Sequence, residues 1–176
     1  MTRDIQEIID ELGFEYTGKT DASNLKVRGE VRNMCEANTC GFYKKSWMCP
    51  PACGDIEEFQ KIFDRMTTCY VFQSFIELED EFDFESMMEL GDIHKKRLNK
   101  LAKIMADEYP DALVLGAGGC SICDECTYPD EPCRFPKIAT TAMEAAGLVV
   151  SDVCKAANMD YNHGPGTMAY VSCVLV

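Results

Sequence analysis

The chain has 176 residues, of which 47% are hydrophobic, and a formal net charge of -13 at pH 7. This length suits one domain, and the apolar content is enough to bury a core without disulfide bonds, so we expect a single cysteine-rich domain over residues 1–176. The negative charge predicts a surface that repels phosphate backbones and anionic lipid, which argues against nucleic acid and membrane as partners.

The cysteines point to metal binding. No apolar stretch at the start is long enough for a signal peptide and no later one for a bilayer span, so we expect a cytoplasmic protein. Eleven cysteines in a reducing compartment are not typical of a disulfide framework, and an odd number cannot pair completely. Metal ligation is the better interpretation.

The first third of the chain predicts short elements around a loop. Apolar residues at helical spacing predict a helix over residues 4–12, and weak alternation predicts one or two strands within residues 14–31. Residues 35–54 are rich in Cys, Pro and Gly without periodicity, which indicates a loop organised by metal ligation. A helix over residues 55–66 follows, with Asp55 placed to cap it.

The middle of the chain predicts a strand, a long helix and a second strand. β-branched and aromatic residues favour a strand over residues 69–78, and a helical stripe runs through residues 84–109. The apolar run at residues 112–116 is typical of a buried strand. Together they predict a right-handed crossover connection.

The last part predicts two helices and a terminal strand. A helix over residues 136–146 is closed by Gly147, Ser151 caps a helical turn to residue 155, and residues 170–176 form a strand. The fold class predicted by the whole pattern is α/β, with α+β as the alternative, in which helices pack on a small mixed sheet and two cysteine-rich metal-binding loops are inserted.

The strongest chemical signal is the second cysteine loop. Three cysteines follow one another at two-residue intervals and a fourth comes shortly before Pro136: Cys120, Cys123, Cys126 and Cys133. In the bacterial ferredoxin run, the same close spacing lets three thiolates of one loop converge on an iron-sulfur cluster. We therefore predict that these four cysteines bind one cluster.

Zinc is the alternative cofactor, because tetrahedral thiolate sites also use Cys-x2-Cys pairs. Zinc sites usually draw two pairs from separate knuckles, whereas three close cysteines in one loop fit a cuboidal cluster better. Arg134 is placed to donate to cluster sulfur. Lys44 and Lys45 of the first loop are candidates for offsetting cluster charge, although solvated lysines are commoner.

The first cysteine loop is a candidate second metal site, with Cys35, Cys40, Cys49 and Cys53 as ligands. Its spacing is less diagnostic, so iron-sulfur, zinc and free thiols all stay open there. Three further cysteines lie in predicted strands or helices, where a free cysteine usually packs as a small apolar residue. They are Cys69, Cys154 and Cys173.

The two loops also carry a family resemblance. Residues 40–51 read Cys-Gly-Phe-Tyr-Lys-Lys-Ser-Trp-Met-Cys-Pro-Pro, residues 118–126 read Gly-Gly-Cys-Ser-Ile-Cys-Asp-Glu-Cys, and Cys-Arg-Phe-Pro at 133–136 precedes Ala-Met-Glu-Ala-Ala-Gly at 142–147. With these motifs the chain resembles the bacterial and archaeal domain-of-unknown-function family 2284, the predicted metal-binding proteins. The resemblance implies a cysteine-bound metal centre of iron-sulfur type in prokaryotic cytosol, but no reaction or partner.

Two departures from the family pattern affect the site. Thr-Thr-Ala at 140–142 stands where Arg-Pro-Ser is expected, which weakens an anion-binding role there. Cys53 extends the Cys-Pro-Pro motif to a further cysteine, which leaves the fourth ligand of the N-terminal site open.

Several functions fit these motifs. The first is an electron carrier or redox accessory protein with one or two 4Fe-4S clusters that docks on a redox protein or enzyme partner. The second is a cluster-dependent enzyme or activation factor, which a three-cysteine site or a pocket near Glu144 and His163 would favour. A zinc-stabilised binding module is the third, and a thiol redox or metal-delivery protein the fourth. No small-molecule substrate follows from the sequence.

Overall fold

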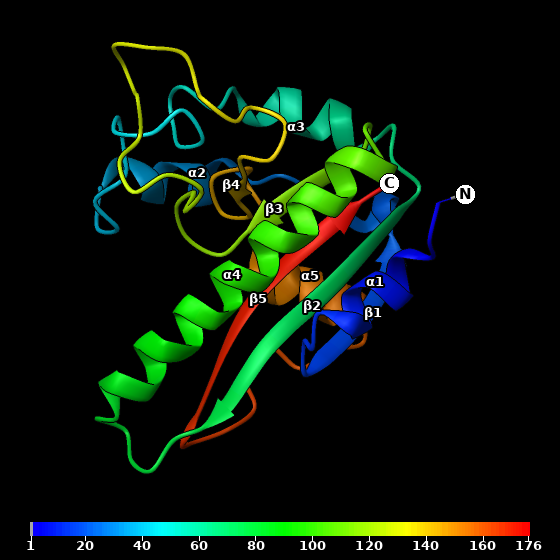
Figure 1. The fold of residues 1–176 in the computed structure, drawn as a ribbon, viewed down its shortest axis with the longest axis vertical. Helices are drawn as coiled ribbons and strands as arrows, with labels where there is room; N and C mark the ends of the chain where they lie inside the picture. Colours follow the sequence, from blue (N-terminus) through cyan, green and yellow to red (C-terminus); the bar gives the residue numbers. More distant parts are fainter. Residues whose placement is uncertain (1) are drawn as a thin grey trace.

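The computed structural model describes residues 2–176 and has a five-stranded mixed sheet at its centre (Figure 1). The strand order is β1 (Tyr16–Asp21), β2 (Thr68–Glu77), β5 (Thr167–Leu175), β3 (Leu113–Gly116) and β4 (Thr141–Ala142). The pairs β1–β2, β2–β5 and β5–β3 are antiparallel, and β4 runs parallel to β3. The predicted α/β class with a small mixed sheet is confirmed.

Helices cover both faces of the sheet. On one face, α1 (Ile5–Glu11) and α4 (Phe84–Glu108) pack against Phe72 and Val174. On the other, α3 (Ile56–Phe63) and α5 (Val150–Ala156) pack against the neighbouring strand residues Val71 and Cys173. This alternation of adjacent residues between two cores is what the period of two in a strand requires.

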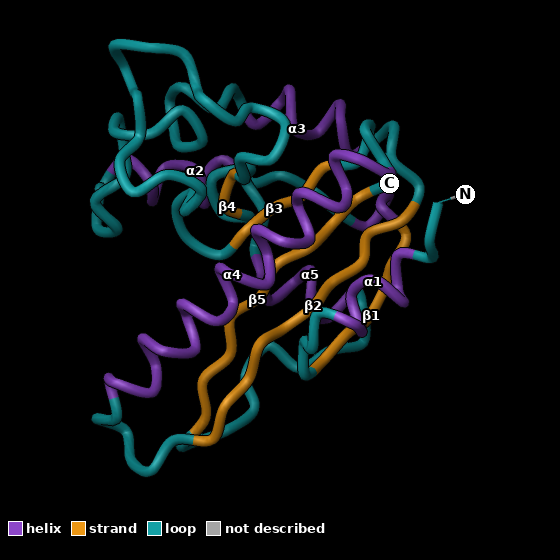
Figure 2. Tube along the Cα trace, in the orientation of Figure 1, coloured by secondary structure: helices purple, strands orange, loops and turns teal. Residues whose placement is uncertain are grey.

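The predicted crossover is present with one strand inserted. α4 leads from β2 to β3, which run parallel because each is antiparallel to β5 between them (Figure 2). The right-handed sense of this connection stays a prediction. No helix within residues 2–176 combines the length and the apolar character that crossing a membrane needs.

Most predicted elements lie within a few residues of their expected bounds, for local reasons. Asp4 caps α1 by accepting a hydrogen bond from the backbone N–H of Glu7. Asp55 and Glu58 form a reciprocal capping box at the start of α3. The caps and apolar stripes that define these helices are encoded within one or two turns of sequence, which is why the pattern finds them.

The sequence missed a helix before the first cysteine loop. After β1, a short 3-10 helix (Ala22–Asn24) leads to α2 (Gly29–Glu36), whose last turn carries Cys35. Val31 is the buried residue of α2, so this helix has too few apolar residues at helical spacing to be recognised from the sequence. A tertiary bond fixes its start, because the backbone N–H of Arg28 donates to the carbonyl of Gly147 at 2.8 Å.

The helix predicted over residues 136–146 is wrong. This segment forms turns and then β4, in which Thr141 pairs with Leu115 of β3. A β-branched residue beside an open sheet edge gains more from that pairing than from the helix favoured by the alanines. Gly147, with φ of +90°, closes the turn. The cap predicted at Ser151 is also wrong, since α5 has Val149 at its N-cap.

A polar cluster is buried between α4 and the sheet. His94 is 1% exposed, and its ring nitrogens lie 2.9 Å from the hydroxyl of Ser74 and 2.7 Å from that of Ser172. Arg97 also donates to the Ser74 oxygen, so that hydroxyl is left to donate to the ring. Burial, together with the charge of Arg97, lowers the pKa of His94 to about 4, against a smaller opposing effect of Glu15.

This neutral histidine makes the stability depend on pH. Below pH 6.5 the unfolded chain binds a proton at His94 that the folded chain does not take up until about pH 4. The contribution of neutral His94 to the free energy of unfolding is complete above pH 6.5 and is lost as the pH falls. The free energy of unfolding should decrease by about 2 kcal/mol between pH 7 and pH 5. Chemical denaturation at pH 7 and pH 5 should show that the free energy of unfolding changes less with pH in His94→Asn than in wild type. An equal change in both proteins would contradict a neutral, buried His94.

Candidate metal centre

The two cysteine loops pack directly against each other (Figure 1). Trp47 of the first loop donates its indole N–H to the carbonyl of Glu131 at 2.9 Å and meets the ring of Tyr128 edge-on at 4.9 Å. The ring of Phe42 lies over Gly119, where an added Cβ would come within 3.0 Å of it. A side chain at Gly119 would therefore require the Phe42 ring to shift by a few tenths of an ångström.

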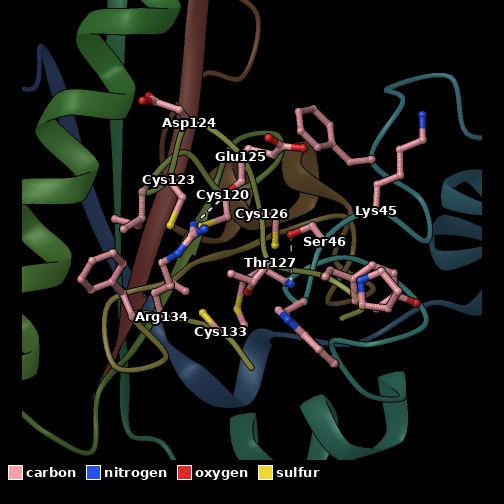
Figure 3. A pocket seen from close by; sticks show the side chains of 18 of the residues that line it. Lys45, Ser46, Cys120, Cys123, Asp124, Glu125, Cys126, Thr127, Cys133 and Arg134 are labelled. Carbon is pink, nitrogen blue, oxygen red and sulfur yellow. Dashed lines mark hydrogen bonds between the residues drawn. The ribbon is translucent and has the colours of Figure 1, made fainter. Parts of the chain in front are cut away.

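A cavity lies between these loops and contains the C-terminal cysteines (Figure 3). Its volume is about 500 Å³. The first loop contributes residues 41–42 and 44–48, which include both lysines, and the second contributes Arg134 and Phe135. All four predicted cluster ligands line it: Cys120, Cys123, Cys126 and Cys133.

The environment of Cys126 lowers the pKa of its thiol. Partial burial alone would raise this pKa, but the polar effect of the backbone N–H groups of Trp47 and Tyr128 outweighs it. The Ser46 hydroxyl and the charge of Arg134 act in the same direction, so the net pKa is lowered. Arg134 itself is held by a 2.9 Å bond from its guanidinium to the carbonyl of Glu125. Thiolates are the form of cysteine that binds metals.

A second cavity of about 370 Å³ contains the N-terminal cysteines. Cys35 of α2 and Cys40 and Cys49 of the following loop line it, and so does Glu144. Cys53 lies outside this lining. Its backbone N–H donates to the carbonyl of Cys49, and its side chain packs at the edge of the core below α3.

Arg32 connects the parts of the N-terminal site. Its guanidinium donates to the carbonyls of Ala145 and Gly54 at 2.8 and 2.7 Å, and one of its nitrogens lies 3.7 Å from the Cys53 sulfur. It thereby joins α2 to the Cys53 turn and to the turn after β4. Arg32 and Cys35 are three residues apart, which places them on one face of the helix.

Burial dominates the titration of the N-terminal thiols. Desolvation raises the pKa values of Cys35 and Cys53, partly offset by the charge of Arg32. Desolvation and the neighbouring thiolates raise the pKa of Cys49 to about 11. Glu144 lines the cavity and is partly open to solvent, and desolvation by the protein around it raises the pKa of its carboxyl. Burial therefore favours the protonated thiol at Cys35, Cys49 and Cys53.

The other predicted residues lie elsewhere. His163 stacks on Tyr16 with ring centroids 4.6 Å apart, away from both cavities. The three remaining cysteines are buried in the core, as expected: Cys69, Cys154 and Cys173. Within residues 2–176, no three Cys, His, Asp or Glu side chains converge closely enough to bind a single metal ion.

The family comparison matches nearly the whole chain. Residues 19–176 fit the model of the family described as "Predicted metal-binding protein (DUF2284)". The chain belongs to this family. The matched range includes both cysteine loops and both cavities, so the resemblance inferred from the motifs is confirmed.

The other comparisons add little. No curated protein matches the chain. Among solved structures, epoxyqueuosine reductase from Bacillus subtilis is similar over 97% of this chain and 43% of its own, with 10% sequence identity and a TM-score of 0.43. The chain thus spans less than half the length of that protein. A similarity this distant carries no argument about function.

Sequence reasoning missed two functional residues. Arg32 could be found only with α2, since the spacing to Cys35 has meaning only on a helix. Ser46 precedes Trp47 in the family motif, but its effect on the pKa of Cys126 acts between residues 80 positions apart in the chain. Such long-range pairings leave no signal in a single sequence.

The bonds of Arg32 predict a measurable loss of stability. Arg32→Met leaves two backbone carbonyls without their donor and should lower the free energy of unfolding by about 1–3 kcal/mol. The control is Arg28→Met, which removes an exposed ion pair to Asp152 (3.2 Å) and should change little. Chemical denaturation of both variants checks this, and similar losses would show that Arg32 has no special role.

Proposed function

We propose that this protein is an iron-sulfur protein that binds two 4Fe-4S clusters, one in each cysteine cavity, and transfers electrons to a partner protein. The observation that carries the proposal is the gathering of all four C-terminal cysteines around one cavity of about 500 Å³. When bound, a cluster accepts and releases single electrons. The family description as metal-binding agrees with this assignment.

The donor set fits a cluster better than zinc. The thiolates of a 4Fe-4S cluster each bind a different iron, whereas the four ligands of a structural zinc share one ion at about 2.3 Å. The C-terminal cavity is far larger than one ion requires. Four thiolates around such a space therefore support the cluster.

The surrounding side chains suit a negatively charged centre. Lys44, Lys45 and Arg134 all line the C-terminal cavity, and the charge of Arg134 acts on the thiol of Cys126. Trp47 and Tyr128 cover it with aromatic surface, which limits access of water. The two cavities share Phe42 in their linings, so that ring stands between the proposed redox centres.

The partner would dock at the cysteine loops. Phe135 is 47% exposed and lines the C-terminal cavity, and Phe42 is 42% exposed at the shared wall. An apolar contact of this kind beside the metal centre supports docking there by a redox protein or enzyme. The overall charge of -13 favours a basic partner surface and opposes nucleic acid and membrane.

A second candidate is a cluster-dependent enzyme. Cys35, Cys40 and Cys49 line the N-terminal cavity, whereas Cys53 does not. A cluster held there by three cysteines has one iron free for a substrate, and Glu144 in the same lining offers a carboxyl beside it. This arrangement favours chemistry at the N-terminal site and electron supply at the C-terminal one.

The deciding measurement is iron, acid-labile sulfide and zinc on anaerobically purified protein. We expect roughly eight irons with matching sulfide per chain, and about half of each in Cys123→Ser and in Cys49→Ser. Cys154→Ala, which removes a buried core cysteine, is the matched control and should keep all the iron. Zinc without sulfide, or full iron in Cys123→Ser, would overturn the proposal.

Cys53→Ser separates the two candidates. If the protein is purely an electron carrier with four cysteines per cluster, this variant should lose iron as Cys49→Ser does. If the N-terminal site has three cysteine ligands, Cys53→Ser should keep its iron, because the Cys53 side chain lies outside the cavity lining. Electron paramagnetic resonance of the reduced variants identifies which cluster remains.

A further inference from the structure

A third cavity, of about 320 Å³, adjoins the N-terminal cysteine cavity. It lies beside the part of β5 that continues beyond the end of β3, since β3 pairs with β5 only as far as Cys173. Figure 2 shows the longer course of β5. Residues 169–171 of β5 form one wall and residues 117–119, which follow β3, form another. Lys95 of α4 and Tyr161 also line the cavity.

The third cavity shares a wall with the cysteine cavity. Phe42, Gly118, Gly119 and Glu144 appear in the linings of both. Because Phe42 lies tightly over Gly119, this wall is only as thick as the side chains that form it. A molecule in the third cavity would therefore lie next to whatever Cys35, Cys40 and Cys49 bind.

The lining combines aromatic rings with two opposite charges. Phe42, Tyr161 and Tyr170 contribute the rings, and Tyr170 is fixed by a hydrogen bond from its hydroxyl to the carbonyl of Met87 at 3.3 Å. Lys95 and Glu144 are the charged side chains of the lining. Rings bind flat conjugated groups, lysine binds an acidic group, and a glutamate oxygen accepts a hydrogen bond from N–H or O–H.

We propose that this cavity binds a small planar conjugated anion, with Lys95 at its acidic group, the aromatic residues against its ring and Glu144 accepting from a ring N–H or hydroxyl. A volume of about 320 Å³ fits one or two fused rings, at the lower end of ligand cavities. This site extends the proposed function and rests on it in one respect. If the proposed function holds, the group next to the bound anion is an iron-sulfur cluster.

The test uses pterin-6-carboxylate as the probe, since it is planar, conjugated and anionic and carries N–H groups. Binding to anaerobically purified full-length protein is measured by isothermal titration calorimetry. Lys95→Glu turns attraction into repulsion and should weaken binding about tenfold or more, and Glu144→Leu should weaken it about fivefold. The matched control is Lys96→Glu, the exposed neighbour on α4 that does not line the cavity, which should change binding less than about twofold.

Several outcomes would overturn the site. Absence of binding at millimolar probe would do so, as would equal weakening by Lys95→Glu and Lys96→Glu, which would reveal a general charge effect. Equally tight binding of pterin without its carboxylate would remove the role of Lys95. Weakening confined to the two cavity variants supports the proposal.

The same samples separate this site from the proposed function. Absence of iron and sulfide would overturn the function, while a selective loss of binding in Lys95→Glu would still establish the cavity. With clusters present, the probe should alter the electron paramagnetic resonance spectrum of Cys123→Ser, which keeps the N-terminal cluster, and leave that of Cys49→Ser unchanged. The reverse pattern would show that the probe binds beside the other cysteine group.

Discussion

The contact between the two cysteine loops determines where every candidate ligand lies. Neither loop has strands or long helices of its own, and they meet through the Trp47 bond to Glu131 and the fit of Phe42 over Gly119. Through this contact, two groups of cysteines far apart in sequence line adjacent cavities. Segments without regular secondary structure need such tertiary bonds, since little else offsets the entropy of ordering them.

The sheet and the helices next to it fix the ends of both loops. β3 delivers the chain to the second loop, and the turn after β4 returns it to the core, where Arg32 binds the carbonyl of Ala145. The first loop starts from α2 and ends at the capped start of α3. Rigid elements thus hold the ends of each loop, while all the candidate ligands except Cys35, which lies on α2, are on the parts between them.

The sequence predicted the regular elements well where the information is local. The caps at Asp4 and Asp55 and the long stripe of α4 each reside in a few neighbouring residues. The prediction failed where a residue distant in the sequence determines the local structure. The start of α2 is fixed by a hydrogen bond to Gly147, and the strand conformation of β4 by its pairing with β3. The four cysteines grouped by their spacing line one cavity, and their role as ligands stays a prediction. The spacing could not show that the Cys53 side chain lies outside the N-terminal cavity, because that depends on how α2 and the turn after β4 meet.

The placement of Trp47 gives the molecule a built-in optical probe. It is the single tryptophan of the chain, and it lines the C-terminal cavity but not the N-terminal one. A change in the polarity or contents of the C-terminal cavity therefore alters the surroundings of the indole directly. The intrinsic fluorescence of the protein reports on that cavity without a label, because no other tryptophan contributes to the signal.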